Sequence, residues 1–240
     1  MTDRTDERRF YNVLHAAAAD RRHPHERARL AAVTGALRRH AGAPGGALRL
    51  LDLGCGSGWL ADRLTPWGAV TGVDLADEVV ADAARRYPRV RFVSADFTAA
   101  LPLGDERFDV VVCSEVIEHV EDQPGLVALM AARLHAGGVA IVTCPNRRGA
   151  AAWWSQPGLR PQPREAWLTP AELRGLLHAG FEIVETRTIV GDYAGWGFPG
   201  HSRRRRDRWR HRLLRALGVG TLRAALGHGL YVVACGRRRP

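Results

Sequence analysis

The chain has 240 residues, a length that fits one α/β domain with an elaboration. With 46% apolar residues it can bury a full core, and no run of 18 apolar residues predicts a membrane-spanning helix. The first four residues, Met1–Arg4, lack the basic-then-apolar pattern of a secretory signal, so we expect a cytoplasmic protein.

The net charge of +10 is distributed unevenly. Residues 200–240 carry twelve arginines and one acid, whereas residues 1–199 carry 23 arginines and 24 acids. The sequence contains no lysine, which indicates a compositional bias toward arginine rather than a demand from a partner. We interpret the Arg-rich segment 203–215 first as a solvated helix face. An acidic partner, a phosphate-bearing substrate, RNA or an anionic membrane surface stay open as alternatives.

Four cysteines each lie in or beside an apolar run, and none forms a C-x-x-C pair: Cys55, Cys113, Cys144 and Cys235. Such cysteines in a reducing compartment predict buried, free thiols.

Taken in chain order, residues 1–45 are typical of a helical N-terminal cap, which ends at the Gly- and Pro-rich run 41–46. Short apolar strands then alternate with helices through a core of residues 46–145. The expected strands are Leu48–Leu53, Ala69–Val73, Val90–Val93, Val110–Cys113 and Val139–Thr143, with helices at 58–65, 76–87 and 123–135. This alternation predicts βαβ units and a parallel sheet that is covered on both faces.

The alternation is interrupted after residue 145. Residues 146–168 hold Trp153, Trp154 and Trp167 and are interpreted as a lid loop. In the C-terminal part, 169–240, a capping sequence at Thr169 starts a helix that ends near Gly180. The last two expected strands are Phe181–Val190 and Gly229–Cys235, and they flank a substrate-side insertion, 191–228, with a helix candidate at 202–216. The whole chain, 1–240, is expected to form a single domain.

A Gly-rich turn, Leu51–Gly58, follows the first expected strand. Glycine allows a tight turn and a close approach to a ligand, and a helix N-terminus offers unpaired N–H groups. A dinucleotide site would want glycine where Trp59 stands, so the pattern G-x-G-x-x-G fails.

Two acids follow the next two expected strands. Asp74 ends the second strand, where a carboxylate can accept hydrogen bonds from both hydroxyls of a ribose. Asp96 ends the third strand, where it can accept from an adenine amino group while Phe97 packs on the ring. A helix N-cap is the alternative role of Asp96.

These motifs, in order on three successive strands, resemble the class I S-adenosylmethionine-dependent methyltransferases, over roughly residues 45–145. The run Gly138–Pro145 looks like that family's fifth strand. The resemblance implies an α/β, Rossmann-like fold with a seven-stranded, mostly parallel sheet, helices on both faces and an antiparallel final strand. It also implies S-adenosylmethionine as cofactor and S-adenosylhomocysteine as product. The implied cofactor contacts are Gly54 and Gly56 at the methionine part, Asp74 and Leu75 at the ribose, Asp96 and Phe97 at the adenine, and Ser114 near the sulfonium.

The segment Ser114–Val120 is similar to the ubiquinone-biosynthesis O-methyltransferases, which carry a type 11 methyltransferase domain, and to the small-RNA 2′-O-methyltransferases. In both groups a Glu-x-x-Glu-His element can hold a magnesium ion, here implied at Glu115, Glu118 and His119. On an α-helix these three side chains would share one face. Because Mg²⁺ prefers oxygen ligands, a metal-free His119 that acts as general base is favoured over a metal ligand, and a near-core structural histidine stays open as the alternative. The ubiquinone group also implies an arginine at the cofactor carboxylate, for which Arg27 is the nearest match.

The sequence therefore predicts O-methylation of a small, partly aromatic molecule in specialised or quinone-type metabolism. An RNA 2′-O-methyltransferase that binds phosphates with its Arg-rich tail is the first alternative. A non-catalytic cofactor-binding protein on the same fold is the second. The pattern does not indicate an oligomeric state.

Overall fold

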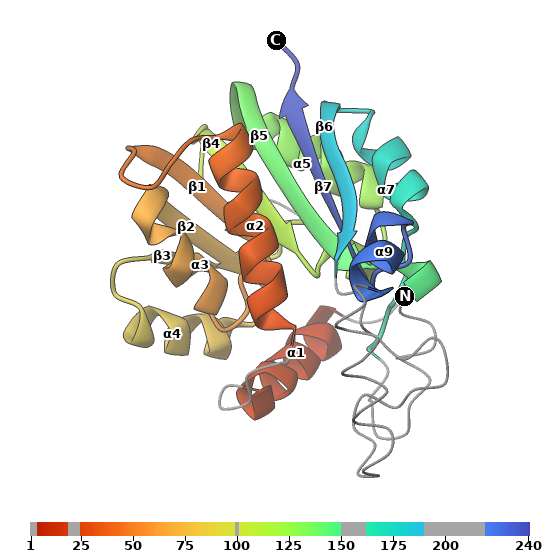
Figure 1. The fold of residues 1–240 in the computed structure, drawn as a ribbon. Coiled ribbons are helices and arrows are strands. Elements are labelled where there is room, and N and C mark those ends of the chain that lie inside the picture. The colour runs from red at the N-terminus through yellow and green to blue at the C-terminus, as the bar shows by residue number, and fades with distance from the viewer. Residues whose placement is uncertain (1–3, 19–24, 99–100, 150–161, 190–218) are drawn as a thin grey trace.

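A computed structural model describes residues 4–18, 25–98, 101–149, 162–189 and 219–240 (Figure 1). Seven strands form one sheet: β1 (Leu48–Leu53), β2 (Gly68–Asp74), β3 (Arg91–Ser94), β4 (Phe108–Ser114), β5 (Leu134–Pro145), β6 (Phe181–Ile189) and β7 (Tyr231–Arg238). Their order across the sheet is β3-β2-β1-β4-β5-β7-β6. The first five strands pair in parallel, and β7 is antiparallel to both β5 and β6. The predicted Rossmann-like, seven-stranded sheet is confirmed.

The described helices are α1 (Arg4–Ala18), α2 (Glu26–His40), α3 (Trp59–Leu64), α4 (Asp77–Arg86), α5 (Gln123–Arg133), α7 (Pro170–Leu177) and α9 (Val219–Ala225). Two short 3-10 helices, η1 (Thr65–Trp67) and η2 (Ile117–His119), lie between them. Two of these helices, α1 and α2, lie within residues 1–45, where the sequence predicts a helical cap. Within these ranges no helix is both long and apolar enough to cross a membrane.

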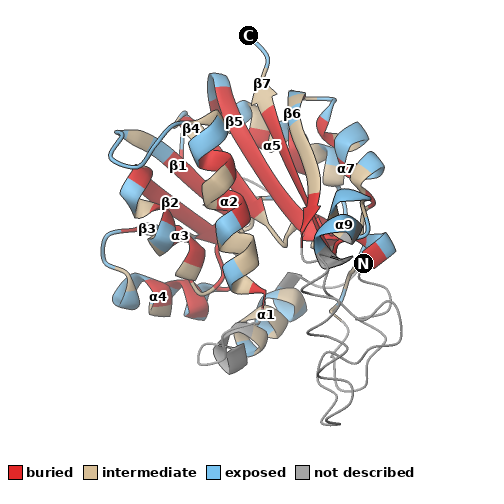
Figure 2. Cartoon of the chain, in the orientation of Figure 1, coloured by how far each residue is buried: buried red, intermediate tan, exposed pale blue. Residues whose placement is uncertain are grey.

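The core has two layers, one on each side of the sheet, and the central strands are buried from both sides (Figure 2). Leu51 and Leu53 on β1 pack in the layer that α5 and α7 cover. Leu50, on the other face of the same strand, packs in the layer of α2 and α3. Because both faces are covered, the parallel strands are continuously apolar instead of alternating with polar residues.

The helix start predicted at Thr169 is confirmed as a capping box. The Glu172 backbone N–H donates to Thr169 Oγ1, and the Thr169 backbone N–H donates to the Glu172 carboxylate at 2.8 Å. Two of the N–H groups that a helix start leaves without partners are therefore satisfied.

The four cysteines are buried and free, as predicted. Burial raises the pKa of each thiol, for Cys235 to about 12. They therefore remain protonated at neutral pH and act as small apolar side chains.

β5 is longer than the strand Val139–Thr143 that the sequence predicts, because it begins at Leu134. A register shift between Phe108 and Val110 on the neighbouring β4 accommodates the extra residues. Gly137, with φ of 76°, lies within this added length. The expectations for residues 150–161, with Trp153 and Trp154, and for the Arg-rich segment 203–215 lie outside the described residues.

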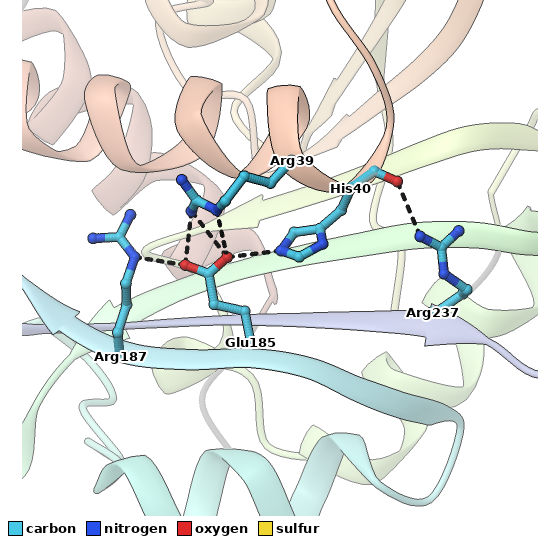
Figure 3. A network of polar contacts seen from close by, with 5 residues as sticks. All are labelled: Arg39, His40, Glu185, Arg187 and Arg237. Atoms are coloured by element: carbon cyan, nitrogen blue, oxygen red, sulfur yellow. Dashed lines mark hydrogen bonds and ion pairs between the residues drawn. The ribbon is translucent and has the colours of Figure 1, made fainter.

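A polar network fastens the end of α2 to the edge strand β6 (Figure 3). Glu185 on β6 accepts two hydrogen bonds from Arg39 Nη2, at 2.7 and 2.9 Å, and one from Arg187 Nε at 2.6 Å. His40 Nε2 lies 2.7 Å from the same carboxylate, and Arg237 Nη2 donates to the His40 carbonyl at 3.1 Å. Burial raises the pKa of Glu185, but the hydrogen bonds from these partners outweigh it, so the pKa is lowered.

Glu185→Gln is expected to reduce the free energy of unfolding at pH 7 by about 1–2 kcal/mol, since charge-assisted hydrogen bonds are lost. A lowered folded-state pKa stabilises the fold above the unfolded pKa of a carboxyl group, and this stability is lost as pH falls through the folded value. The difference between wild type and variant should therefore shrink between pH 7 and pH 3, measured by urea unfolding. Glu182→Gln, on an exposed position of the same strand, is the matched control and should change little.

Candidate functional site

The Gly-rich turn lies where β1 ends, at the carboxyl edge of the parallel strands. Gly54, Gly56 and Gly58 have φ of 74°, 49° and 77°, in the left-handed region that favours glycine. A Cβ on Gly54 would also lie 2.2 Å from Val116 Cγ2 on the segment that follows β4. The turn therefore packs closely against that segment. Glycine is required at position 54 because of its positive φ and because a Cβ would overlap Val116.

Gly54→Ala is expected to lower the free energy of unfolding by about 2–4 kcal/mol, because a strained φ and a steric overlap add together. Gly227→Ala is the matched control: its φ is 80°, but nothing lies within 4 Å of the added Cβ. It should cost only the strain, about 1 kcal/mol. Equal losses in chemical denaturation of the two variants would show that contact with Val116 is unimportant.

Asp74 ends β2 beside this turn. Its Oδ2 accepts from the Gly56 backbone N–H at 2.8 Å, and its Oδ1 accepts from the Ala76 backbone N–H at 3.0 Å. The amides of the turn thus orient the carboxylate, and each oxygen retains a second lone pair for a hydroxyl donor. Leu75, the next residue, is half-buried.

Asp96 and Phe97 follow β3, the next strand. Asp74 pairs with Ser94 in the sheet, and the Ala95 N–H donates to the Asp74 carbonyl at 2.9 Å, so the ends of β2 and β3 are adjacent. Asp96 Oδ1 accepts from the backbone N–H and the hydroxyl of Thr98, at 2.9 and 2.6 Å. Gly54, Asp74 and Asp96 therefore follow neighbouring strands along one edge, as the order of the motifs predicts.

Two hydroxyl groups, at the end of β4 and on the neighbouring β5, contact the residue that follows β4. Thr143 Oγ1 donates to Glu115 Oε1 at 2.9 Å, and Ser114 Oγ lies 2.8 Å from Thr143 Oγ1. Since the single Thr143 proton is used on Glu115, Ser114 must donate to Thr143. Glu115 has φ of 59°, the single positive φ of a non-glycine residue among those described. Strained backbone of this kind is concentrated at functional sites.

The expectation that Glu115, Glu118 and His119 share a helical face is wrong. Only Ile117–His119 is helical, as a 3-10 turn, and the positive φ of Glu115 directs its side chain toward Thr143. Glu118 is almost fully buried, with Oε2 lacking a hydrogen-bond partner within the described part of the chain. Burial and, secondarily, the charge of Glu115 raise the pKa of Glu118.

Within the described ranges, the three side chains whose possible metal-ligand atoms lie close together are His40, Glu185 and Cys235. Glu185 is already neutralised by two guanidinium groups in the network of Figure 3. A cation at this position would have to displace both, so this cluster is structural.

His119 has a defined orientation. Its Nδ1 lies 2.6 Å from the carbonyl oxygen of Arg164, which can only accept, so Nδ1 carries a proton and the basic nitrogen of the neutral ring is Nε2. Nε2 is 3.6 Å from Glu118 Oε1. The ring of Tyr11, from α1, lies edge-on with its centroid 6.2 Å from that of His119.

Tyr11 is a site residue that sequence reasoning missed. Burial raises the pKa of its hydroxyl, and the carboxylates of Glu7, Glu118 and Asp74 raise it further. α1 is fixed there through Asn12 Nδ2, which donates to Asp77 on α4 at 3.0 Å. The sequence signal that could have identified it is an aromatic residue within an otherwise polar helix.

Arg29 was also missed, because Arg27 matched the family pattern more closely. Arg27 is exposed on α2, whereas Arg29 points into the site with its guanidinium carbon 5.8 Å from the centroids of both Trp59 and Tyr231. Its Nη1 lies 3.9 Å from Glu115 Oε2. The helical register of α2 places Arg29, and not Arg27, on the side that faces Glu115. The spacing of the sequence motif alone does not show this difference.

Asp52 on β1 is the third missed residue. It is almost fully buried, and its Oδ2 has no hydrogen-bond partner in the described ranges. Burial and the charge of Asp74 raise its pKa to about 7. Buried carboxylates with perturbed pKa values cluster at functional sites, and a cation nearby would relieve their repulsion.

Comparisons with known proteins identify what this chain is similar to. A family model described as a methyltransferase domain matches residues 51–142. A probable S-adenosylmethionine-dependent methyltransferase of Mycolicibacterium smegmatis is 41% identical over 151 residues, 62% of this chain and 56% of that protein. A ubiquinone biosynthesis O-methyltransferase of Cereibacter sphaeroides (strain ATCC 17029) is 32% identical over 167 residues, 63% of this chain and 67% of that protein.

Among solved structures, the N-methyltransferase NodS of Bradyrhizobium japonicum WM9, in complex with S-adenosyl-L-homocysteine, matches with a TM-score of 0.61. The identity is 17%, and the match covers 92% of this chain and 90% of NodS, so it shows a common fold. The chain spans 56% of the length of the M. smegmatis relative.

Proposed function

The chain belongs to the class I S-adenosylmethionine-dependent methyltransferases, and we propose that it transfers a methyl group from S-adenosylmethionine to a nucleophilic oxygen of a small, partly aromatic metabolite. The observation that carries the proposal is the shared edge of β1, β2 and β3, where the Gly54 turn, Asp74 and Asp96 lie side by side. Ligands of open α/β sheets bind at this carboxyl edge.

The side chains present fit this cofactor. The glycine turn leaves no Cβ in the way of a bound group, and the Asp74 carboxylate is already oriented to accept from ribose hydroxyls. Asp96 and Phe97 would hold the adenine, and Ser114 would lie near the sulfonium. Buried carboxylates at the same edge, Asp52 among them, favour a positively charged ligand.

The bound cofactor supplies a methyl group on a positively charged sulfur, which already activates the carbon toward displacement. The chain's own task is then to align the acceptor, exclude water and remove the acceptor's proton; proximity and orientation contribute on the order of 7–11 kcal/mol. We assign the proton transfer to His119 Nε2, since the Arg164 carbonyl fixes the other nitrogen as a donor. The Glu118 carboxyl, 3.6 Å away, would stabilise the imidazolium that results.

O-methylation is favoured by the ubiquinone O-methyltransferase relative and by a histidine with a defined basic nitrogen. The RNA alternative depends on the Arg-rich segment 203–215, which lies outside the described residues. A magnesium ion is not part of the proposal, because the ligand atoms of Glu115, Glu118 and His119 do not form a cluster within the described part of the chain and His119 Nδ1 is bonded to a carbonyl.

The test is a methyl-transfer assay with labelled S-adenosylmethionine. One reaction contains pooled phenols and catechols and another contains small RNAs, each with and without magnesium. Label in the small-molecule fraction supports the proposal, and label in acid-precipitable RNA would contradict it. Binding of S-adenosylhomocysteine without transfer to any acceptor would support the non-catalytic alternative. Loss of methyl transfer on addition of a chelator would show that the reaction requires a metal ion.

A further inference from the structure

The turn that carries His119 has little rigidity of its own. η2 is three residues long, and the His119 N–H donates to the Val116 carbonyl at 2.9 Å. The next backbone hydrogen bond, from the Val120 N–H to the Ile117 carbonyl, is long at 3.4 Å. Short 3-10 turns have poorer hydrogen-bond geometry than an α-helix. The orientation of the imidazole therefore depends on contacts from outside the turn.

A strap, residues 164–166, supplies two such contacts. The Arg164 carbonyl accepts from His119 Nδ1 at 2.6 Å. The Ala166 N–H donates to the Glu118 carbonyl at 2.8 Å. The strap thus bonds to two successive residues of η2, and the proton on Nδ1 depends on the strap staying in place.

Gln123, the first residue of α5, joins the turn to the strap. Its Nε2 donates to the Ile117 carbonyl of η2 at 2.9 Å and to the Ala166 carbonyl of the strap at 3.4 Å. An amide NH₂ group has two protons, one for each carbonyl, and both carbonyls can only accept, so the orientation of the amide is determined. A second side-chain contact of the strap, from Arg164 to Glu121 at 3.0 Å, is an exposed ion pair of the kind that stabilises little.

α5 gives this amide a fixed origin. Leu126 and Met130 are buried in the core layer that α5 and α7 cover. Asp122 caps the start of the helix, where its Oδ1 accepts from the Gly125 N–H at 2.8 Å. Gln123 therefore projects from a well-packed element and relates the positions of η2 and the strap to the core.

The tautomer of His119 links these contacts to chemistry. Which nitrogen of a neutral imidazole carries the proton is set by the hydrogen bond that the other nitrogen makes. With the strap in place, Nδ1 is protonated, and Nε2 can take the proton that leaves the acceptor's hydroxyl when its oxygen receives the methyl group. With the strap displaced, part of the population would carry the proton on Nε2 and could not act as a base.

We propose that Gln123 is a positioning residue for this proton transfer, because it holds η2 and the strap together and so keeps Nε2 of His119 as the basic nitrogen. The role in proton transfer rests on the proposed function, whereas the effect of Gln123 on the tautomer does not. The competing explanation is that Gln123 only satisfies two carbonyls and stabilises the fold.

The first measurement is the tautomer of His119 by ¹⁵N NMR of histidine-labelled protein at pH 8. Because the chain has ten histidines, a His119→Gln variant assigns the signals. The wild type should carry the proton on Nδ1. Gln123→Met keeps the side-chain length but removes both N–H groups, and it should shift the tautomer ratio roughly three- to tenfold toward Nε2–H, the scale of one lost hydrogen bond.

Two further variants control this result. Gln123→Lys places three N–H donors near the same carbonyls and should restore part of the wild-type ratio. Gln162→Met is the matched control, because the Gln162 side chain makes no hydrogen bond within the described ranges, and it should leave the ratio unchanged.

The second measurement is single-turnover methyl transfer with the acceptor found in the pooled assay. Gln123→Met should lower the rate roughly three- to tenfold, while the KM of the acceptor and the affinity for S-adenosylhomocysteine stay within about twofold. An electron-poor analogue of the acceptor, whose hydroxyl is already ionised at the assay pH, needs no base. The variant should methylate that analogue as fast as the wild type does, whereas a general loss of structure would slow both reactions.

The outcomes separate the inference from the proposed function. A wild type with the proton on Nε2, or a Gln123→Met variant with an unchanged tautomer ratio, would overturn the inference. Equal slowing with the neutral and the ionised acceptor would also overturn it in favour of the structural explanation. If no acceptor is methylated, the proposed function fails and the role in proton transfer fails with it, while the tautomer ratio still decides whether Gln123 sets the state of the imidazole.

Discussion

His119→Ala is expected to lower kcat by roughly 10²- to 10⁴-fold, the range that a general base contributes. Its affinity for S-adenosylhomocysteine should stay within about twofold, because the ring lies beside Tyr11 and Glu118 and is not among the expected cofactor contacts. The reason for the large effect is the fixed tautomer. With Nδ1 donating to the Arg164 carbonyl at 2.6 Å, Nε2 is the basic nitrogen available to accept the acceptor's proton. The measurement is single-turnover methyl transfer with the acceptor found in the pooled assay.

A structural role for the same ring is excluded by chemical rescue. Added imidazole should restore part of the activity of His119→Ala if the ring acts as a base, but it would not repair a displaced η2. His135→Ala, at an exposed position on β5, is the matched control and should leave turnover unchanged. Turnover of His119→Ala within about twofold of wild type would mean that the base lies elsewhere or that the acceptor reacts already deprotonated.

The sheet could be predicted from the sequence because its signals are local. Each parallel strand is a short apolar run bounded by turn residues, as in Leu48–Leu53, and a sheet buried on both faces needs no alternation. Local signals also predicted that Gly54, Asp74 and Asp96 lie at the carboxyl edge of the sheet, because a residue at the end of a parallel strand must lie there. The capping sequence at Thr169 is likewise a local signal, and the structure contains both of its hydrogen bonds.

The remainder of the site depends on contacts between distant segments, which no local pattern encodes. Tyr11 and Arg29 come from two N-terminal helices, and their approach to His119 and Glu115 is set by how α1 and α2 pack. The error at Glu115 has a different cause. The spacing of the Glu-x-x-Glu-His element predicts an α-helix, but Glu115 has a positive φ, and the neighbouring Val116 contacts Gly54. A tertiary contact thus accompanies a backbone conformation that helical spacing could not predict.

Asp74→Ala is expected to weaken binding of S-adenosylhomocysteine by at least roughly 100-fold, the loss of two hydrogen bonds to a charged acceptor. The change removes the acceptors for the ribose hydroxyls, and it also leaves the Gly56 and Ala76 N–H groups without the carboxylate that now holds them.

Asp74→Asn separates these two contributions. The amide oxygen can still accept from one of the two backbone N–H groups, but the charge is lost and the NH₂ group opposes the other donor. We therefore expect Asp74→Asn to lose less stability in urea than Asp74→Ala, and to bind S-adenosylhomocysteine roughly 10-fold more weakly than wild type, measured by calorimetry. Asp82→Ala on the exposed face of α4 is the matched control, because its carboxylate pairs with Arg85 and Arg86 on the same helix. If Asp74→Ala binds the ligand as tightly as wild type, the carboxyl edge of β2 is not where the ribose lies, and the assignment of the neighbouring Asp96 and Phe97 to the adenine fails with it.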